Sequence, residues 1–415
     1  MLEQTPVVAV ICEYDPFHRG HARQFALIRQ RLPGAKIVCL MSGCFTQRGM
    51  PALHAPAVRA RTAMLAGADL VLELPCAFAV RDAEHFALGA VHILSQLGFV
   101  DALSFGMEAD GADVLAPLRE AAIMLETPDA SFDAALKRVL STGAPYAAAL
   151  GLALAQRIPI PSGLWQQPNN LLALCYLRAL YRLQSPLQPL PVPRTGSGYH
   201  QAALTSGVLP SATAVRAAFL QGRYAQADEA CGYALAQAPV CLPDALDAVL
   251  LAKLRASTPD ALRTLPYCTE GLENRLYQCA RRATTRAELL VLLKTRRYAH
   301  TRLSRLCCHA LLGITTPLLA AHPLPEYVRL LGFREESKPL LSLLGKSRMP
   351  VLSRAADGDS ANPLYQLDAH AYDLWTLGAR LPAGLMARQG VVRVHEGESL
   401  HRKGVATSCE PYSLT

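Results

Sequence analysis

Two histidines three residues apart, His18 and His21, are the side chains whose types and spacing point most directly to chemistry. An apolar run, Val7–Cys12, precedes them and predicts a buried parallel strand, and a helical pattern follows from about residue 21 to 32. Gly20 lies between them, where we expect a tight turn. A strand, a turn and a helix N-terminus form an anion site, because free N–H groups and the helix dipole favour negative charge. Two imidazoles add donors for charge that develops on phosphate oxygens, so we predict both as catalytic. The alternative is two structural histidines, each satisfied by the backbone.

The elements around these histidines alternate regularly over the first hundred residues. Short apolar runs separate helical patterns of ten to sixteen residues, which is typical of βαβ units in a parallel sheet with helices on both faces. In such sheets ligands bind at the carboxyl ends of the strands. The expected strands are 7–12, 36–41, 69–74 and 101–105, and the expected helices are 21–32, 57–66 and 82–97.

The patterns along the whole chain predict a division into domains. We expect residues 1–220 to form a Rossmann-like α/β domain, with a helical insertion at about 112–186 and a short strand near 189–192. Residues 221–390 read as a mostly helical domain with frequent arginines, and residues 391–415 as a polar tail.

The amino-acid composition limits the class of protein to which this chain can belong. The 415 residues are 51% hydrophobic and 18% charged, which indicates a globular protein of two or three domains. The net charge of +8 permits a polyanionic partner such as RNA without requiring one. The twelve cysteines include no Cys-x-x-Cys pair, which favours a reducing cytosol over a disulfide framework or a zinc ribbon. We expect a cytoplasmic protein with no signal peptide, no membrane span and no all-protein metal site.

Polar residues also follow the second and fourth expected strands. Ser42, Gln47 and Arg48 would reach the same sheet edge as the histidines, and Gly106 would let a flat ligand such as adenine approach the backbone. Asn169 opens a helical pattern further along the chain. An ordinary loop, a turn glycine and a helix N-cap are the structural alternatives.

Two later segments suit phosphate. Arg194 stands directly before a Gly-Ser-Gly turn, and Ser211 reads as the N-cap of a helix that carries Arg216 one turn later. A simple turn and a capped helix with a solvated arginine are the alternatives.

A basic segment near residue 300 suits RNA. If this segment is helical, Tyr298, Arg302 and Arg305 share one face, with Arg297 beside them. A basic face with an aromatic side chain can contact phosphates and stack on a base. A solvated charged face is the more ordinary alternative.

Taken in order, these motifs resemble one family. The His-x-Gly-His turn resembles that of the HIGH-motif nucleotidyltransferase superfamily, and within it the chain is similar to the bacterial tRNA(Met) cytidine acetate ligases. The resemblance covers nearly the whole chain. The matching stretches are residues 13–21, 41–43, 47–49, 67–71, 73–75, 105–106, 168–170, Arg194 with 196–200, 211–214 with Arg216, 297–298, 302–303, 327–329 and 331–333.

The resemblance implies an activity and its partners. The family condenses acetate with ATP to acetyl-adenylate and passes the acetyl group to N4 of the wobble cytidine of elongator tRNA(Met), with Mg²⁺ expected alongside ATP. The basic face would then bind the tRNA. The residues implied or suggested as ATP contacts are Ile11, Cys12, Glu13, Tyr14, Gly20, His21, Gln24, Gly106, Asn169, Arg194, Ser211 and Arg216.

The chain departs from the family pattern at Asp15, Arg19, Cys44 and Met107. Asp15 stands where the family usually has asparagine, and its charge would weaken phosphate binding unless it is turned away or meets Arg19 or a metal. Two other functions stay open at this point. One is a nucleotidyltransferase that adenylylates a phosphorylated small metabolite, and the other is an RNA-binding protein with an inactive nucleotide site.

Overall fold

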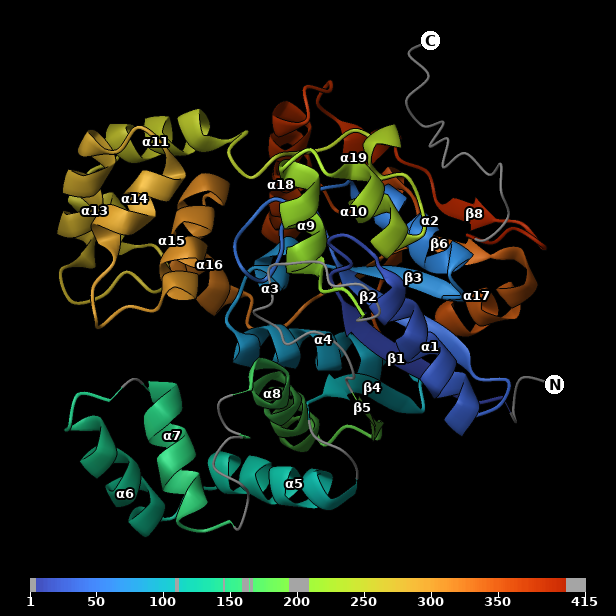
Figure 1. The fold of residues 1–415 in the computed structure, drawn as a ribbon, viewed down its shortest axis with the longest axis horizontal. Helices are drawn as coiled ribbons and strands as arrows, with labels where there is room; N and C mark the ends of the chain where they lie inside the picture. The colour runs from blue at the N-terminus through green and yellow to red at the C-terminus, as the bar shows by residue number, and fades with distance from the viewer. Residues whose placement is uncertain are drawn as a thin grey trace.

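The computed structural model describes residues 5–108, 112–144, 146–158, 164, 167–193 and 209–400. Within these residues one mixed sheet of eight strands forms the centre of the molecule (Figure 1). The strands are β1 Val7–Cys12, β2 Lys36–Ser42, β3 Leu70–Leu74, β4 Ala102–Met107, β5 Gln188–Pro193, β6 Val328–Arg334, β7 Val351–Leu352 and β8 Val392–Val394.

Helices surround the sheet and extend away from it (Figure 1). In the first half they are α1 Arg19–Arg31, α2 Pro56–Leu65, α3 Cys76–Ala79, α4 Ala83–Leu97, α5 Ala112–Glu126, α6 Ala130–Leu140, α7 Tyr146–Ala155 and α8 Pro168–Arg182. In the second half they are α9 Ala212–Leu220, α10 Tyr224–Cys231, α11 Asp247–Ala256, α12 Pro259–Arg263, α13 Leu272–Arg282, α14 Arg286–Leu293, α15 His300–Leu312, α16 Thr316–Ala321, α17 Pro339–Leu344, α18 Pro363–Gly378 and α19 Leu385–Arg388.

The strand order explains where a ligand can bind. The order is β5-β4-β1-β2-β3-β6-β7, and the first five of these strands are parallel. The chain runs outward from β1 to β2 and β3, then returns to place β4 on the other side of β1. The neighbouring connections therefore diverge between β1 and β4, which opens a crevice at the carboxyl ends of these two strands.

Alternation along β1 separates two layers of core. Val8 and Val10 pack on one face with α1 and α2, whereas Val7 and Ala9 face the core that contains α4 and α8. The chain therefore covers both faces of the sheet, as its nearly continuous apolar strands predict.

Most elements of the first half agree with the sequence prediction. The strand over Val7–Cys12 and the helices at 57–66 and 82–97 are confirmed within a residue, and helices α5 to α8 fill the predicted insertion. Helix α1 begins earlier than predicted, at Arg19, so Gly20 is its second residue rather than the centre of a tight turn.

The second half departs from its prediction. Residues 328–394 supply three strands that the sequence analysis did not predict, and β6 joins the sheet antiparallel to β3. The start of the predicted polar tail includes β8, which pairs with β6. Gly332 permits this pairing, because a Cβ there would lie 2.8 Å from the Val392 carbonyl oxygen. The sheet thus draws strands from both sides of the predicted boundary at residue 220, and the division into domains stays a prediction.

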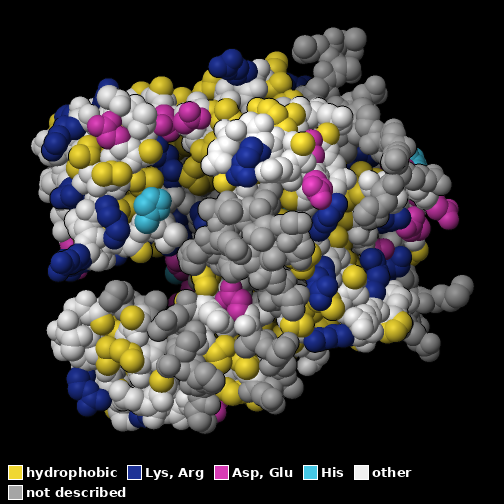
Figure 2. Space-filling model, viewed as in Figure 1, with side chains coloured by type: hydrophobic (Ala, Val, Ile, Leu, Met, Phe, Trp, Pro, Cys, Tyr) yellow, Lys and Arg dark blue, Asp and Glu magenta, His cyan; other side chains and the backbone are white. Residues whose placement is uncertain are grey.

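Two groups of helices stand beside the sheet (Figure 1). Helices α11, α13, α14 and α15 pack on one another, and α6 packs on α7. The space-filling view shows a hollow between these two groups (Figure 2). Within the part of the chain that the structure describes, no helix is both long and apolar enough to cross a membrane.

Candidate active site

A cavity of about 320 Å³ opens at the carboxyl ends of β1 and β4. This volume suits a bound small molecule of nucleotide size. Almost all of the predicted ATP-site residues line it, although their segments lie up to two hundred positions apart. They are Ile11, Cys12, Glu13, Tyr14, His18, Gly20, His21, Gln24, Gly106, Asn169, Ser211 and Arg216. The remaining predicted contact, Arg194, lies outside the described residues.

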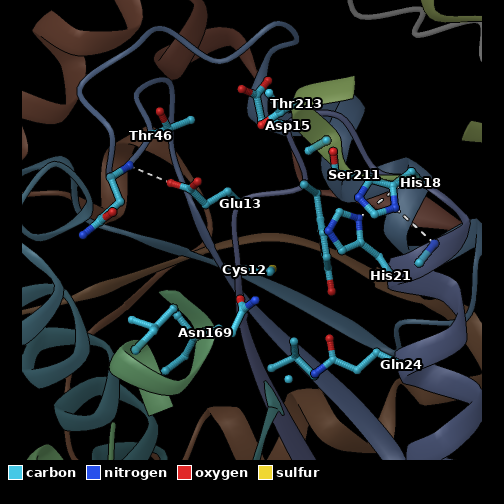
Figure 3. A pocket seen from close by; sticks show the side chains of 18 of the residues that line it. Cys12, Glu13, Asp15, His18, His21, Gln24, Thr46, Asn169, Ser211 and Thr213 are labelled. Carbon is cyan, nitrogen blue, oxygen red and sulfur yellow. Dashed lines mark hydrogen bonds between the residues drawn. The ribbon is translucent and has the colours of Figure 1, made fainter. Parts of the chain in front are cut away.

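The two histidines form the N-terminal cap of α1. The Gly20 N–H donates to His18 Nδ1 (3.1 Å), and the His18 N–H donates to His21 Nδ1 (3.2 Å). The rings stack with their centroids 3.8 Å apart (Figure 3). Since each Nδ1 accepts a hydrogen bond, each neutral imidazole carries its hydrogen on Nε2. The backbone thereby fixes both tautomers and places the donor hydrogen of each ring on Nε2.

Gly20 is required for space rather than for a turn. A Cβ on Gly20 would lie 2.8 Å from His18 Cε1 and 3.0 Å from His18 Nδ1. Any side chain at this position would push the His18 ring away from the backbone N–H that it caps. The predicted importance of Gly20 is retained, but its physical reason is the close approach of the ring.

Asp15 has partners other than those expected. It forms an ion pair with Arg216 (3.2 Å), and its other oxygen accepts the Leu53 N–H (2.7 Å). Arg216 also donates to the Asp15 carbonyl oxygen. The acidic departure is therefore neutralised by an arginine that reaches it from α9, and Arg19 is exposed at the surface. The Arg216 side chain still lines the cavity.

Glu13 follows β1 directly and lines the same cavity. Its Oε1 accepts the Gln47 N–H (2.6 Å), which ties the side chain to the loop after β2. Burial raises the pKa of the Glu13 carboxyl, the Gln47 hydrogen bond opposes this shift, and nearby Asp15 adds to it.

Arg59, a residue of α2, joins the loops after β1 and β2. This almost fully buried side chain donates to the carbonyl oxygens of Glu13 (2.5 Å), His54 (3.0 Å) and Gly43. One planar guanidinium thus fixes three backbone positions at once, which a lysine could not do with the same geometry. Arg59 was not predicted from the sequence, because its partners are backbone atoms that no motif marks.

The opposite wall comes from β4 and α8. Asn170 Oδ1 accepts the Glu108 N–H (3.0 Å), and Asn169 Nδ2 donates to Glu108 Oε1 (2.6 Å). The pair of asparagines therefore connects the start of α8 to the end of β4. Of the two, Asn169 lines the cavity and Asn170 is buried as a structural link.

Not every predicted polar residue reaches the cavity. Gln47 and Arg48 line it, whereas Ser42 is fully buried and belongs to the sheet. Tyr14 is almost fully buried, and burial raises the pKa of its hydroxyl well above the ordinary value. Its ring packs 4.8 Å from the His21 ring.

Several lining residues were not predicted. Leu172 and Tyr176 follow Asn169 along one face of α8, so helical periodicity from Asn169 could have found them. Thr46, Met50 and Pro51 come from the loop after β2.

The predicted RNA face is arranged differently in the structure from the single helical face that the spacing suggested. Tyr298 precedes α15, which begins at His300, and its side chain is buried, so it cannot stack on a base. Arg302 donates to the Tyr267 carbonyl oxygen (2.8 Å) and to Thr269 Oγ1 (3.0 Å). Arg305 lies against the Tyr267 ring. Arg297 is exposed, in an ion pair with Glu270 (2.7 Å).

Among the described residues, no three His, Cys, Asp or Glu side chains gather in the manner of a metal site. The described residues that line the cavity offer three kinds of group. They are the two imidazoles held by the backbone, the Asp15–Arg216 ion pair and the carboxyl group of Glu13.

The family model described as HIGH Nucleotidyl Transferase matches residues 5–385. A tRNA(Met) cytidine acetate ligase from Acetivibrio thermocellus is 34% identical over 410 residues, which cover 92% of this chain and 97% of the relative. The chain belongs to the HIGH nucleotidyl transferase family and, within it, to the tRNA(Met) cytidine acetate ligases. Another relative of that name, from Alkaliphilus metalliredigens, is 33% identical over 405 residues, covering 90% of this chain and 94% of its own.

Solved structures agree with the fold of this HIGH nucleotidyl transferase. Apo TmcAL from Thermotoga maritima has a TM-score of 0.85 at 24% sequence identity, and the match covers 94% of this chain and 100% of that one. A second structure of the same protein, bound with alpha-thio ATP, has a TM-score of 0.82 with the same identity and coverage. This likeness confirms the α/β fold with its helical second half.

Proposed function

We propose that this chain condenses acetate with ATP to form acetyl-adenylate and transfers the acetyl group to N4 of the wobble cytidine of elongator tRNA(Met). The observation that carries the proposal is the pair of imidazoles at the N-terminus of α1, each held by a backbone hydrogen bond to Nδ1 that places its hydrogen on Nε2. The names of the relatives support the substrate, and the alpha-thio ATP bound to the Thermotoga maritima protein supports ATP.

In this proposal the triphosphate lies at the start of α1. The free N–H groups and dipole of the helix attract the anion, and His18 and His21 donate to oxygens that gain charge as acetate attacks the α-phosphorus. Acetate is already ionised at neutral pH and needs no base for this step. Positioning and preorganised donors therefore supply most of the acceleration.

We assign the other lining residues supporting roles in binding ATP. Gly106 would lie beside adenine, with Asn169 and Gln24 as its polar neighbours, and Ser211 and Arg216 would close the phosphate side. We propose Arg194 as a phosphate contact on the basis of its sequence position alone. Mg²⁺ would arrive on the phosphates of ATP, as is usual for this small cation.

The helical second half is the proposed tRNA-binding region. Residues 247–305 carry twelve Lys and Arg against five Asp and Glu, so most of the net positive charge lies there. Figure 2 shows Lys and Arg side chains along the outer edge of this group. Arg297 is the predicted contact that remains exposed, whereas Tyr298 is withdrawn and Arg302 and Arg305 bind mainly within the protein.

The test is acetate-dependent exchange of ATP and pyrophosphate across a series of small carboxylates, followed by nucleoside analysis of treated tRNA. We expect exchange with acetate and N4-acetylcytidine only in elongator tRNA(Met). Exchange with a phosphorylated metabolite instead would favour the first alternative function, and RNA binding without any exchange would favour the second.

A further inference from the structure

The second step of the proposed reaction needs a group that the first step does not. The exocyclic amine of cytosine is a weak nucleophile, because its lone pair is delocalised into the ring. As it attacks the acetyl carbonyl, its nitrogen becomes acidic and must lose a proton. A positioned base supplies roughly 10²- to 10⁴-fold in such steps. The two capping histidines are poor candidates, since each Nδ1 already accepts a backbone hydrogen bond and Nε2 carries the hydrogen.

Two carboxyl groups line the cavity in the described part of the chain, Asp15 and Glu13. Asp15 is occupied on both oxygens, by Arg216 and by the Leu53 N–H. Neither oxygen of Asp15 is left to meet an amine of a ligand. Asp15 is therefore a structural partner of α9 rather than a proton acceptor.

Glu13 differs from Asp15 in each of these respects. Its Oε1 is fixed by the Gln47 N–H (2.6 Å), while Oε2 accepts no hydrogen bond from the described residues. Its backbone is held by Arg59, which donates to the Glu13 carbonyl oxygen (2.5 Å). The carboxyl group is thus oriented at two points and retains one oxygen for a ligand.

The position of Glu13 also separates it from the phosphates. In Figure 3 its side chain turns toward the loop that carries Thr46, away from the stacked rings of His18 and His21. A carboxylate is unfavourable beside a triphosphate and favourable beside an amine. Carboxylates are also the side chains that accept a hydrogen bond from cytosine N4.

We propose that Glu13 accepts a hydrogen bond from the exocyclic amine of the acceptor cytosine and takes its proton during acetyl transfer. In this step the bond between N4 and the acetyl carbon forms, and the bond between that carbon and the AMP phosphate oxygen breaks. AMP leaves with the electron pair, and the N4 proton moves to Glu13 Oε2. The proposal rests on the proposed function and assigns Glu13 to its second step.

The charges around Glu13 are consistent with this role. Burial and nearby Asp15 raise the pKa of its carboxyl, whereas Arg216, Arg48 and the Gln47 hydrogen bond act in the opposite direction, and the net shift is upward. A carboxylate with a raised pKa is a stronger base than one with the ordinary pKa.

The experiment separates the two steps in Glu13→Gln. Glutamine keeps an oxygen for the Gln47 N–H but cannot take a proton. Acetate-dependent exchange measures the first step, and single-turnover transfer from chemically prepared acetyl-adenylate to tRNA measures the second. We expect transfer to fall by on the order of 10²-fold or more, and by at least ten times more than exchange. Glu229→Gln, an exposed change on α10, is the matched control and should alter neither rate.

A pH profile supplies a second, independent measurement. In the wild-type protein the transfer rate should rise with pH through the raised pKa of Glu13 and then level off, because only the ionised carboxylate accepts the proton. Glu13→Gln should lose this rise. Equal losses in both steps, or an unchanged transfer rate, or a pH profile shared by both proteins, would each overturn the role of Glu13. A wild-type protein that shows no acetate-dependent exchange would instead overturn the proposed function.

Discussion

The turn at His18–His21 and the segment at Tyr298–Arg305 both combine aromatic or imidazole rings with nearby basic residues, and the fold uses them differently. At the first, both imidazoles accept hydrogen bonds from the backbone of their own turn and line a cavity. At the second, Tyr298 is buried and Arg302 donates to a carbonyl oxygen thirty-five residues away. The first therefore forms a site, and the second mainly holds a helical group together.

The difference comes from the range of the contacts. The capping contacts of His18 and His21 span at most three residues, so the sequence nearly dictates them. An arginine has a long, flexible side chain, and its partner depends on which carbonyl groups the tertiary fold brings within reach. A basic stripe in sequence is consequently weaker evidence for a binding face than a tight motif at a strand end.

The largest expected effect tests the histidine turn. His18→Asn and His21→Gln keep acceptors for the capping bonds but remove the imidazole rings with their Nε2–H donors, so that any side-chain donor that remains is an amide N–H. We expect acetate-dependent exchange to fall by on the order of 10²-fold or more in each variant. Thermal unfolding should change little, since the cap is retained. His18→Ala should lose the same activity and also about 1 kcal/mol of stability. Normal exchange in both capping variants would mean that the histidines are structural only.

An intermediate effect tests the contact between the loop after β2, which lines the cavity, and helix α15, which carries Arg302 and Arg305. Gly49 has a φ of +72°, and a Cβ there would lie 2.8 Å from the Ser304 carbonyl oxygen of α15. Gly49→Ala should cost about 1–2 kcal/mol from the backbone conformation alone, plus the cost of moving α15. Denaturant unfolding measures this change. Gly313→Ala is the matched control, because Gly313 has a φ of +77° and nothing within 4 Å of the added Cβ. Equal losses in both variants would show that the loop after β2 does not depend on α15.

The smallest expected effect distinguishes Arg302 from Arg297, two arginines of the segment near residue 300. Arg302→Ala should lower the free energy of unfolding by about 1–3 kcal/mol, because two hydrogen bonds from a charged group are lost. Arg297→Ala removes an exposed ion pair and should change it by less than about 1 kcal/mol. In tRNA binding the order should reverse, with Arg297→Ala reducing the salt dependence by about one phosphate contact. A flattened salt dependence in a fully stable Arg302→Ala protein would restore Arg302 to the RNA face.

Prediction of the fold succeeded where the pattern is local. The run Val7–Cys12 is continuously apolar, and its strand has those bounds. The strands β6 to β8 were missed, because they are short or are mixed with glycine and arginine. Strand β6 is placed by its pairing with β3, and β7 and β8 are placed by their pairing with β6, with space for β8 at Gly332. The pairing of β3 with β6 joins residues more than two hundred positions apart, and no local periodicity reports it.

The candidate site also has features that the sequence predicted and features that it did not. Its ATP-site residues were predicted from motifs and family resemblance, and those in the described part of the chain line one cavity. Asp15 was expected to weaken phosphate binding unless it turned away or met Arg19 or a metal, and it instead pairs with Arg216, which α9 brings from two hundred residues away. Arg59 and the orientation of Glu13 could not be predicted, since both depend on backbone groups of other loops.

The sequence by itself determined the parallel α/β core, the helix cap made by two histidines and the family, because these depend on local periodicity and short motifs. Only the tertiary structure decided that Asp15 is neutralised, that Tyr298 is buried and that Glu13 keeps one oxygen for a ligand. Each of these outcomes depends on which distant charge, carbonyl group or N–H comes within about 3 Å, the distance at which a hydrogen bond forms.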